Sequence, residues 1–171
     1  MPGAPSHLIR RFLEVASARP LSPGERAAVG SWLTPALGDI FFSQQPADQR
    51  HGYHAGASVA AAGHRAPDVV TAALMHDVGK RHAGFGVAGR SIASVMILLS
   101  LPLSERMVIY RDHGIVAARE LARAGAPPLV VDFALHHHGR RPATIAEDVW
   151  AALKAADKPA KPRAGAGRRI P

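Results

Sequence analysis

The sequence contains no cysteine, which excludes disulfide bonds, thiolate metal ligands and a cysteine nucleophile. Aromatic residues make up only 5% of the chain. A sequence rich in alanine, with few aromatic or β-branched runs, favours packed helices over sheets. The lack of cysteine is also typical of proteins from a reducing compartment. We therefore expect an all-α protein located in the cytoplasm.

Long hydrophobic runs are missing as well. No apolar run reaches the roughly 18 residues that a membrane-spanning helix needs, so we expect no membrane association. The first residues, Met1 to Ser6, lack a basic start followed by an apolar stretch, and no signal peptide is predicted. A length of 171 residues suits one hydrophobic core.

The formal net charge is +8, but it is unevenly distributed. The last residues carry no acid and contain Lys158, Lys161, Arg163, Arg168 and Arg169. We interpret residues 159–171 as a disordered basic tail, because this stretch is rich in proline and glycine. Binding of nucleic acid or an acidic partner through the tail is the alternative interpretation.

Helical patterns fill the rest of the chain, and no alternating strand pattern is found. Ser22-Pro23-Gly24-Glu25 has the form of a capping box with proline at the first helical position, and Pro46 and Pro67 mark further starts. Helices are predicted over 6–18, 23–33, 35–42, 46–62, 67–79, 86–98, 104–110, 113–123, 127–138 and 143–157. Residues 1–45 are predicted to form N-terminal helices that pack on a core domain at 46–158.

Two acids fall at nominal core positions. Asp77 continues the apolar stripe of Val70, Ala73 and Leu74 at i, i+3, i+4 and i+7. Asp157 continues a second stripe from Trp150 and Leu153. A buried carboxylate is costly unless it is paired or binds a metal, so both acids indicate a cation site. The alternative is that Asp77 caps a turn and Asp157 begins the exposed tail.

Histidines supply further candidate ligands. His76 adjoins Asp77, and His51 shares a small apolar helix face with Ala55 and Val59, while His54 is its rival one turn later. Mixed imidazole and carboxylate ligation suits Mn, Fe, Zn, Co or Ni, and Mg is a further candidate. Lys80 could supply a positive charge to a substrate phosphate. Alternatively, its charge only stabilises the C-terminus of its helix.

These residues resemble the HD superfamily of metal-dependent phosphohydrolases. Leu74-Met75-His76-Asp77-Val78-Gly79-Lys80 is similar to its signature L-x-H-D-x-G-K. Asp48-Gln49-Arg50-His51 is similar to the start of its first histidine helix, and Ala155-Ala156-Asp157-Lys158 to its terminal A-D-x. The resemblance implies a bundle of about seven to nine helices that binds a divalent metal through His51, His76, Asp77 and Asp157.

A second resemblance concerns the HD-GYP branch. His113-Gly114-Ile115-Val116-Ala117-Ala118 and His137-His138 are similar to segments that hold a second metal there, with Asp77 bridging two ions around a hydroxide nucleophile. Alternatively, these histidines line the pocket, bind phosphate or lie at the surface. Gly139 follows His138 where the branch has Glu, and the Gly-Tyr-Pro element is absent. Hydrolysis of cyclic dinucleotides is therefore not carried over.

The sequence thus predicts a metal-dependent phosphohydrolase with one or two divalent ions, acting on a nucleotide or a related small phosphoester. Arg111, Arg140 and Arg141 are candidate contacts to the substrate phosphate. A catalytically silent HD module that binds metal or nucleotide in a regulatory role is the alternative. Nucleic-acid binding through the tail is a third hypothesis.

Overall fold

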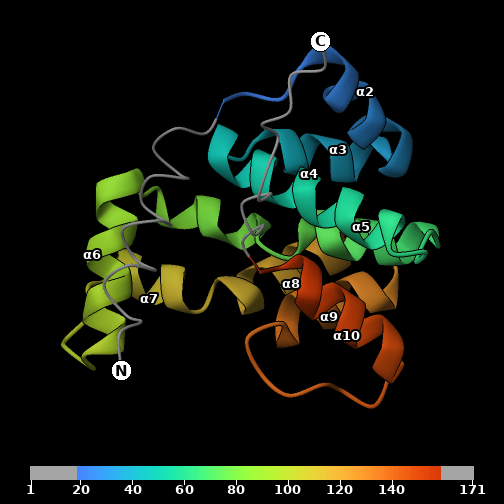
Figure 1. The fold of residues 1–171 in the computed structure, drawn as a ribbon. Coiled ribbons are helices and arrows are strands. Elements are labelled where there is room, and N and C mark those ends of the chain that lie inside the picture. Colours follow the sequence, from blue (N-terminus) through green and yellow to red (C-terminus); the bar gives the residue numbers. More distant parts are fainter. Residues whose placement is uncertain (1–18, 159–171) are drawn as a thin grey trace, which may run out of the picture.

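The computed structural model describes residues 19–158, and within this range every regular element is helical. The all-α class is therefore confirmed. The predicted helix over 6–18 and the predicted tail over 159–171 lie outside the described residues. The elements, drawn in Figure 1, are α2 (Pro23–Trp32), α3 (Pro35–Phe42), α4 (Pro46–Ala61), α5 (Pro67–Met75), the 3-10 helix η1 (Val78–Ala83), α6 (Val87–Leu98), α7 (Glu105–Arg111), α8 (His113–Arg123), α9 (Pro128–His136) and α10 (Glu147–Ala156).

Helix starts follow the predicted capping chemistry. The Ser22 hydroxyl accepts a hydrogen bond from the Glu25 amide at 3.3 Å, and the Glu25 carboxylate accepts one from the Ser22 amide at 2.7 Å. This reciprocal pair satisfies amides that the first turn of α2 leaves free. Thr34 caps α3 through a single bond, its hydroxyl accepting from the Leu37 amide at 3.5 Å. Proline occupies an early position in α3, α4 and α5.

The predicted helix over 67–79 is divided in two. Helix α5 ends at Met75, and Asp77 adopts φ −102° and ψ 1°, which is not α-helical, before η1 begins. His76 and Asp77 therefore lie in a tight turn between two short helices, and not on one continuous helix face. The predicted helix over 143–157 is also shorter, because α10 begins at Glu147, after an extended Ala146.

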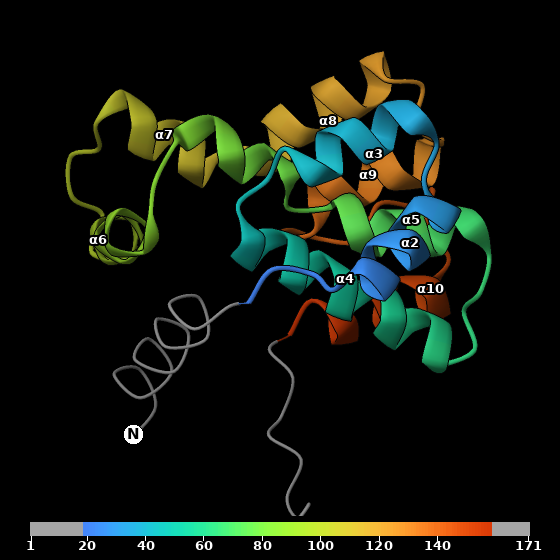
Figure 2. The same ribbon diagram turned by 90° about the horizontal axis from the view of Figure 1, so that it is seen from above.

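The core forms where α4, α5, α8, α9 and α10 meet. Helix α5 lies between α4 and α9, α8 packs on α9, and α10 covers α4 and α5. Figure 2 shows this group from above. All residues of α5 from Val69 to Met75 are buried, so the chain that leads into His76 and Asp77 is enclosed on every side. The largest fully buried apolar side chains are Phe41, Phe133, Leu74, Met75, Leu121, Ile145 and Leu153.

Helices α6 and α7 project away from the other described helices as an arm (Figure 2). Helix α7 packs on η1, whereas α6 packs mainly on α7. Among residues 19–158, no helix is both long enough and apolar enough to cross a membrane.

Candidate metal centre

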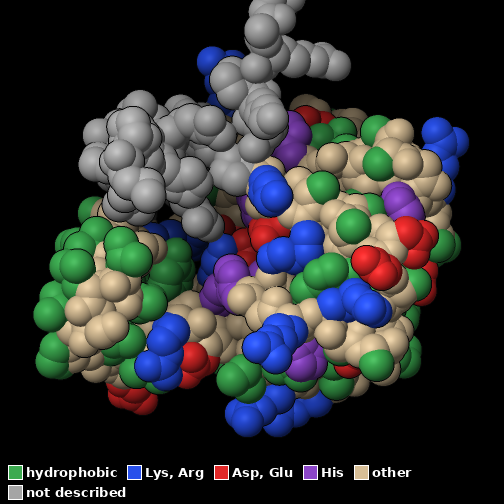
Figure 3. Space-filling view, turned by 60° about the horizontal axis from the view of Figure 1, so that its bottom comes forward, with side chains coloured by type: hydrophobic (Ala, Val, Ile, Leu, Met, Phe, Trp, Pro, Cys, Tyr) green, Lys and Arg blue, Asp and Glu red, His purple; other side chains and the backbone are tan. Residues whose placement is uncertain are grey.

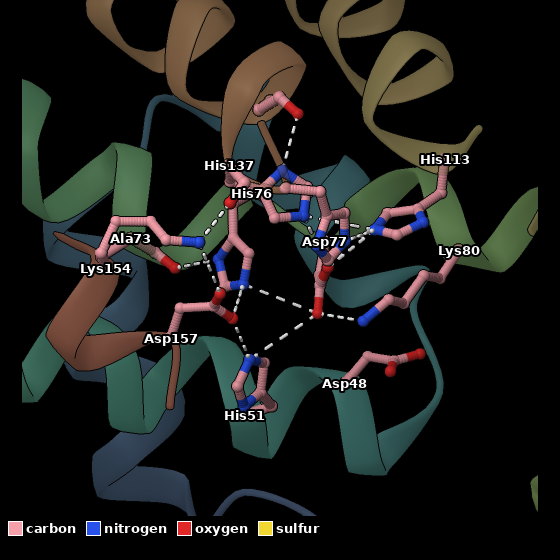
Figure 4. Close-up of polar contacts among 12 residues, drawn as sticks. Asp48, His51, Ala73, His76, Asp77, Lys80, His113, His137, Lys154 and Asp157 are labelled. Atoms are coloured by element: carbon pink, nitrogen blue, oxygen red, sulfur yellow. Dashed lines mark hydrogen bonds and ion pairs between the residues drawn. The ribbon is translucent and has the colours of Figure 1, made fainter. Parts of the chain in front are cut away.

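One group of ligand atoms gathers around Asp77 Oδ2 (Figure 4). His51 Nε2, from α4, lies 3.6 Å from Asp77 Oδ2 and 3.5 Å from Asp157 Oδ1. His76 Nε2 lies 3.6 Å from Asp77 Oδ2 and 3.1 Å from Asp157 Oδ1. The four residues implied by the HD resemblance therefore come together from three separate parts of the chain. His54 is exposed and takes no part.

A second group gathers around the other carboxylate oxygen. His113 Nε2, at the start of α8, lies 3.1 Å from Asp77 Oδ1, and His137 Nε2 lies 3.5 Å from it. His138 Nε2 lies 3.2 Å from His113 Nε2. Within the described residues, these four side chains form one possible metal-holding group, and His51, His76 and Asp77 form another. Asp77 is the member that both groups share.

Backbone carbonyls orient three of the histidines. The Nδ1 atoms of His76, His113 and His137 lie 2.8, 2.7 and 2.8 Å from the carbonyl oxygens of Ala73, Tyr110 and Ala134. A carbonyl oxygen only accepts, so each Nδ1 carries the proton and donates it. The lone pair of each Nε2 then points into the site, as in histidines that bind metals.

This arrangement is unfavourable without a cation. His113 Nε2 and His137 Nε2 face each other at 3.3 Å, and with Nδ1 protonated both present lone pairs. His51 Nε2 is buried and has no hydrogen-bond partner among the described residues. Leaving one such group unsatisfied costs about 1–3 kcal/mol. A divalent cation placed among these atoms would satisfy them, so the residues fit a metal.

The ionisation states also suit a metal. Burial alone would raise the pKa of Asp77, but Lys80, His76 and the contacts with His113 and His137 hold it well below its usual value. The pKa of Asp157 is likewise lowered, because its contacts with His51 and His76 outweigh the effect of burial. The site therefore presents two carboxylates at neutral pH.

Burial keeps two histidines of the second group, His113 and His138, neutral. Burial lowers the pKa of His113, although its contact with Asp77 opposes this. Burial and the neighbouring His137 and His113 lower the pKa of His138 to about 3. Metals bind deprotonated imidazole and carboxylate, so His113 and His138, like Asp77 and Asp157, are in the binding form at pH 7.

Two glycines let the ligand-bearing elements approach closely. A Cβ atom on Gly79 would lie 2.1 Å from the His113 carbonyl oxygen. One on Gly114 would lie 2.7 Å from the Ala134 carbonyl oxygen. Glycine therefore permits η1 to contact the start of α8, and α8 to contact the end of α9. These contacts place His113 and His137 beside Asp77.

The four residues that the sequence predicted to contact phosphate differ in their burial and in their contacts. Lys80 is buried and its Nζ forms an ion pair with Asp77 Oδ2. Arg111 is exposed and binds the Asp112 carboxylate through two bonds of 2.7 Å. Arg141 donates to the Ile145 carbonyl at 2.8 Å, and Arg140 is exposed. None of these three arginines contacts a ligand side chain in the interactions of the described residues, so their roles stay predictions.

Two polar residues near the site were not predicted from the sequence. Asp48 is buried on α4 and receives two bonds from Arg90 of α6, at 2.5 and 2.6 Å. Lys154 donates to the His137 carbonyl, and its Nζ lies 3.9 Å from Asp157 Oδ2 (Figure 4). In the sequence, the position of Lys154 one helical turn before Asp157 could have indicated that it lies near the site.

A family model described as the HD domain matches residues 55–165. The chain belongs to the HD domain family. The matched segment includes His76, Asp77 and Asp157, and HD domains form a superfamily of metal-dependent hydrolases. No curated protein and no solved structure matches the chain significantly. The predicted domain limits of 46 and 158 stay predictions.

Proposed function

We propose that this HD domain is a metal-dependent phosphohydrolase that acts on a nucleotide or a related small phosphoester in the cytoplasm. The observation that carries the proposal is the position of Asp77, whose two oxygens face separate groups of histidine nitrogens. A centre for two cations on either side of one carboxylate suits the attacking and leaving oxygens of a phosphoester.

The side chains around the site would have different roles. His51, His76 and Asp157 would hold one cation, His113, His137 and His138 another, and Asp77 would contact both. Bound divalent cations neutralise phosphate charge and lower the pKa of water. Lys80 keeps Asp77 ionised through their ion pair and adds a positive charge beside the site. Arg111, Arg140 and Arg141 are our candidates for binding the substrate phosphate.

The direct test is hydrolysis by the purified full chain. We expect turnover of nucleoside phosphates or of bis(p-nitrophenyl) phosphate with added Mn²⁺, Co²⁺ or Ni²⁺, and none after treatment with a chelator. His51→Ala should reduce the rate at least about 100-fold. His54→Ala, which removes an exposed histidine from the same helix, is the matched control and should have no effect.

Three other outcomes are informative. No turnover with any metal, together with no bound metal by elemental analysis, would refute the proposal. Bound metal and tight nucleotide binding without turnover would favour the silent regulatory module instead. Binding of DNA or RNA that is lost when residues 159–171 are removed would favour the nucleic-acid hypothesis.

A further inference from the structure

The exposed side of α6 carries an apolar stripe with the spacing of a coiled-coil seam. Its residues follow one another at intervals of four, three and four positions, and all are exposed, namely Ala88, Ile92, Val95 and Leu99. The exposed fractions are 56% for Ile92, 40% for Val95 and 60% for Leu99. Alternating intervals of three and four residues are typical of the a and d positions through which two helices pair. We call these four residues the α6 seam.

Helix α6 is attached to the rest of the molecule along its other side. Arg90 and Ala93 are buried, and Arg90 forms its two bonds with Asp48 of α4. At 3.6 residues per turn, the α6 seam falls on the opposite side of the helix from these two residues. The arm lies at one edge of the described helices (Figure 2), and hydrophobic side chains gather on it, at the left of Figure 3. The α6 seam therefore faces away from the core.

No charge interrupts this surface, because no charged residue occurs between Arg90 and Glu105. Leu98 and Leu101, which are 68% and 45% exposed, extend the apolar area beside the α6 seam. The total is on the order of 500 Å², near the upper end of what a monomer leaves open. Helices that bind anionic lipid surfaces carry lysine or arginine along their polar side, and this stretch has none. A second uncharged helix, in contrast, meets no charge of its own sign here.

The α6 seam is complementary to a second copy of itself. In an antiparallel pair related by a two-fold axis at its middle, Ala88 lies opposite the partner's Leu99. Ile92 then lies opposite the partner's Val95, so every layer combines a larger side chain with a smaller one. A parallel pair would set Ala88 against the partner's Ala88 and Leu99 against the partner's Leu99. That pairing leaves a gap at one end and crowding at the other, which close packing disfavours.

We propose that the α6 seam is a homodimer interface, in which α6 packs antiparallel on the α6 of a second copy of the chain. Such a two-fold interface closes on itself and does not propagate into fibres. The exposed area is smaller than the roughly 800 Å² per partner of a stable complex. We therefore expect a weak dimer, with a Kd on the order of 10 µM. The α6 seam contains no candidate metal ligand, so this inference is independent of the proposed function.

Sedimentation velocity of the full chain, from about 1 to about 300 µM, tests the association. We expect a change from monomer to dimer across this range. Val95→Asp places one acid from each chain in the interface and should weaken the dimer at least about tenfold.

The matched control is Ser94→Asp, which adds the same acid to the same helix outside the α6 seam and should leave the dimer unchanged. Far-UV circular dichroism equal to that of wild type shows that both variants have folded. A wild-type chain that stays monomeric throughout, or a dimer that Val95→Asp does not weaken, would refute the proposal. A monomer that binds phosphatidylglycerol vesicles through Val95 would assign the α6 seam to a lipid surface and would equally overturn it.

Disulfide trapping tests the orientation of the two helices. Because the chain lacks cysteine, Ala88→Cys and Leu99→Cys each provide a unique thiol. When the two variants are mixed and oxidised, we expect a disulfide between them, identified by its mass. Either variant alone should form little, because its two thiols lie about 16 Å apart along the helix axis, whereas a disulfide needs Cα atoms within about 7 Å. Cross-linking mainly within a single variant, or none in the mixture, would overturn the antiparallel interface.

Discussion

Asp77 joins the two halves of the candidate metal centre, since each of its oxygens faces a different set of histidines. Asp77→Asn removes the shared negative charge, and we expect both cations to bind more weakly. His138→Ala affects only the second group, so one cation should remain bound. Elemental analysis and titration calorimetry of the two variants give the stoichiometries. Equal loss of metal in both would contradict the shared position of Asp77.

Lys154 is expected to act as a positioning residue. Its Nζ binds the His137 carbonyl and lies 3.9 Å from Asp157 Oδ2, so it connects residues from both metal-ligand groups. Lys154→Met should lower metal affinity about tenfold, as loss of supporting contacts does, and Lys154→Arg should restore part of it. Lys158→Met removes an exposed lysine after the same helix and is the control. Unchanged affinity in Lys154→Met would contradict this role.

At the scale of elements, the contact between η1 and α8 depends on the absence of a side chain at Gly79. Gly79→Ala would place Cβ 2.1 Å from the His113 carbonyl oxygen. We expect a loss of at least about 1–3 kcal/mol in the free energy of unfolding, and weaker binding of the second metal. Gly38→Ala is the control, because nothing lies within 4 Å of its Cβ position. Chemical denaturation and metal titration measure both effects, and equal stability of the two variants would contradict the expectation.

The same two elements are also joined by an ion pair that makes stability depend on pH. Glu120 of α8 accepts from Arg81 at 2.7 Å and contacts His82 at 3.1 Å. Burial alone would raise the pKa of Glu120, but these contacts lower it below the ordinary 4.5. A lowered folded-state pKa stabilises the protein above the unfolded value, and this contribution disappears as the pH falls through the folded value.

Glu120→Gln should therefore lower the free energy of unfolding at pH 7, and its difference from wild type should shrink below pH 4.5. Arg81→Gln removes the main partner and should reduce the same pH dependence. Urea denaturation across this pH range measures both variants. A deficit in Glu120→Gln that is as large at low pH as at pH 7 would argue against the ion pair as its cause.

At the scale of the whole molecule, the candidate ligands come from α4, the turn after α5, α8, the end of α9 and the end of α10. A cation that binds only the folded arrangement stabilises it by about 2.7 kcal/mol at a concentration of 100 Kd. For a protein of this size, we expect Mn²⁺ to raise the melting temperature by roughly 5–10 °C. Scanning fluorimetry with and without a chelator measures the shift, and its absence in wild type would argue against the site.

The sequence alone predicted the helical class, the capping box of α2 and, through the HD resemblance, the set of candidate metal ligands. Helix periodicity and caps act over a few residues, so they can be read locally. The HD pattern and the position of two acids on apolar stripes likewise needed no contacts between distant segments.

Only the tertiary structure decided how those residues meet. The turn at Asp77 replaced the predicted continuous helix, because packing of η1 on α8 through Gly79 determines the local backbone. The choice of His51 over His54 and the contacts of Lys154 follow from how helices distant in sequence pack. These contacts form across the core, and no local pattern of residues encodes them.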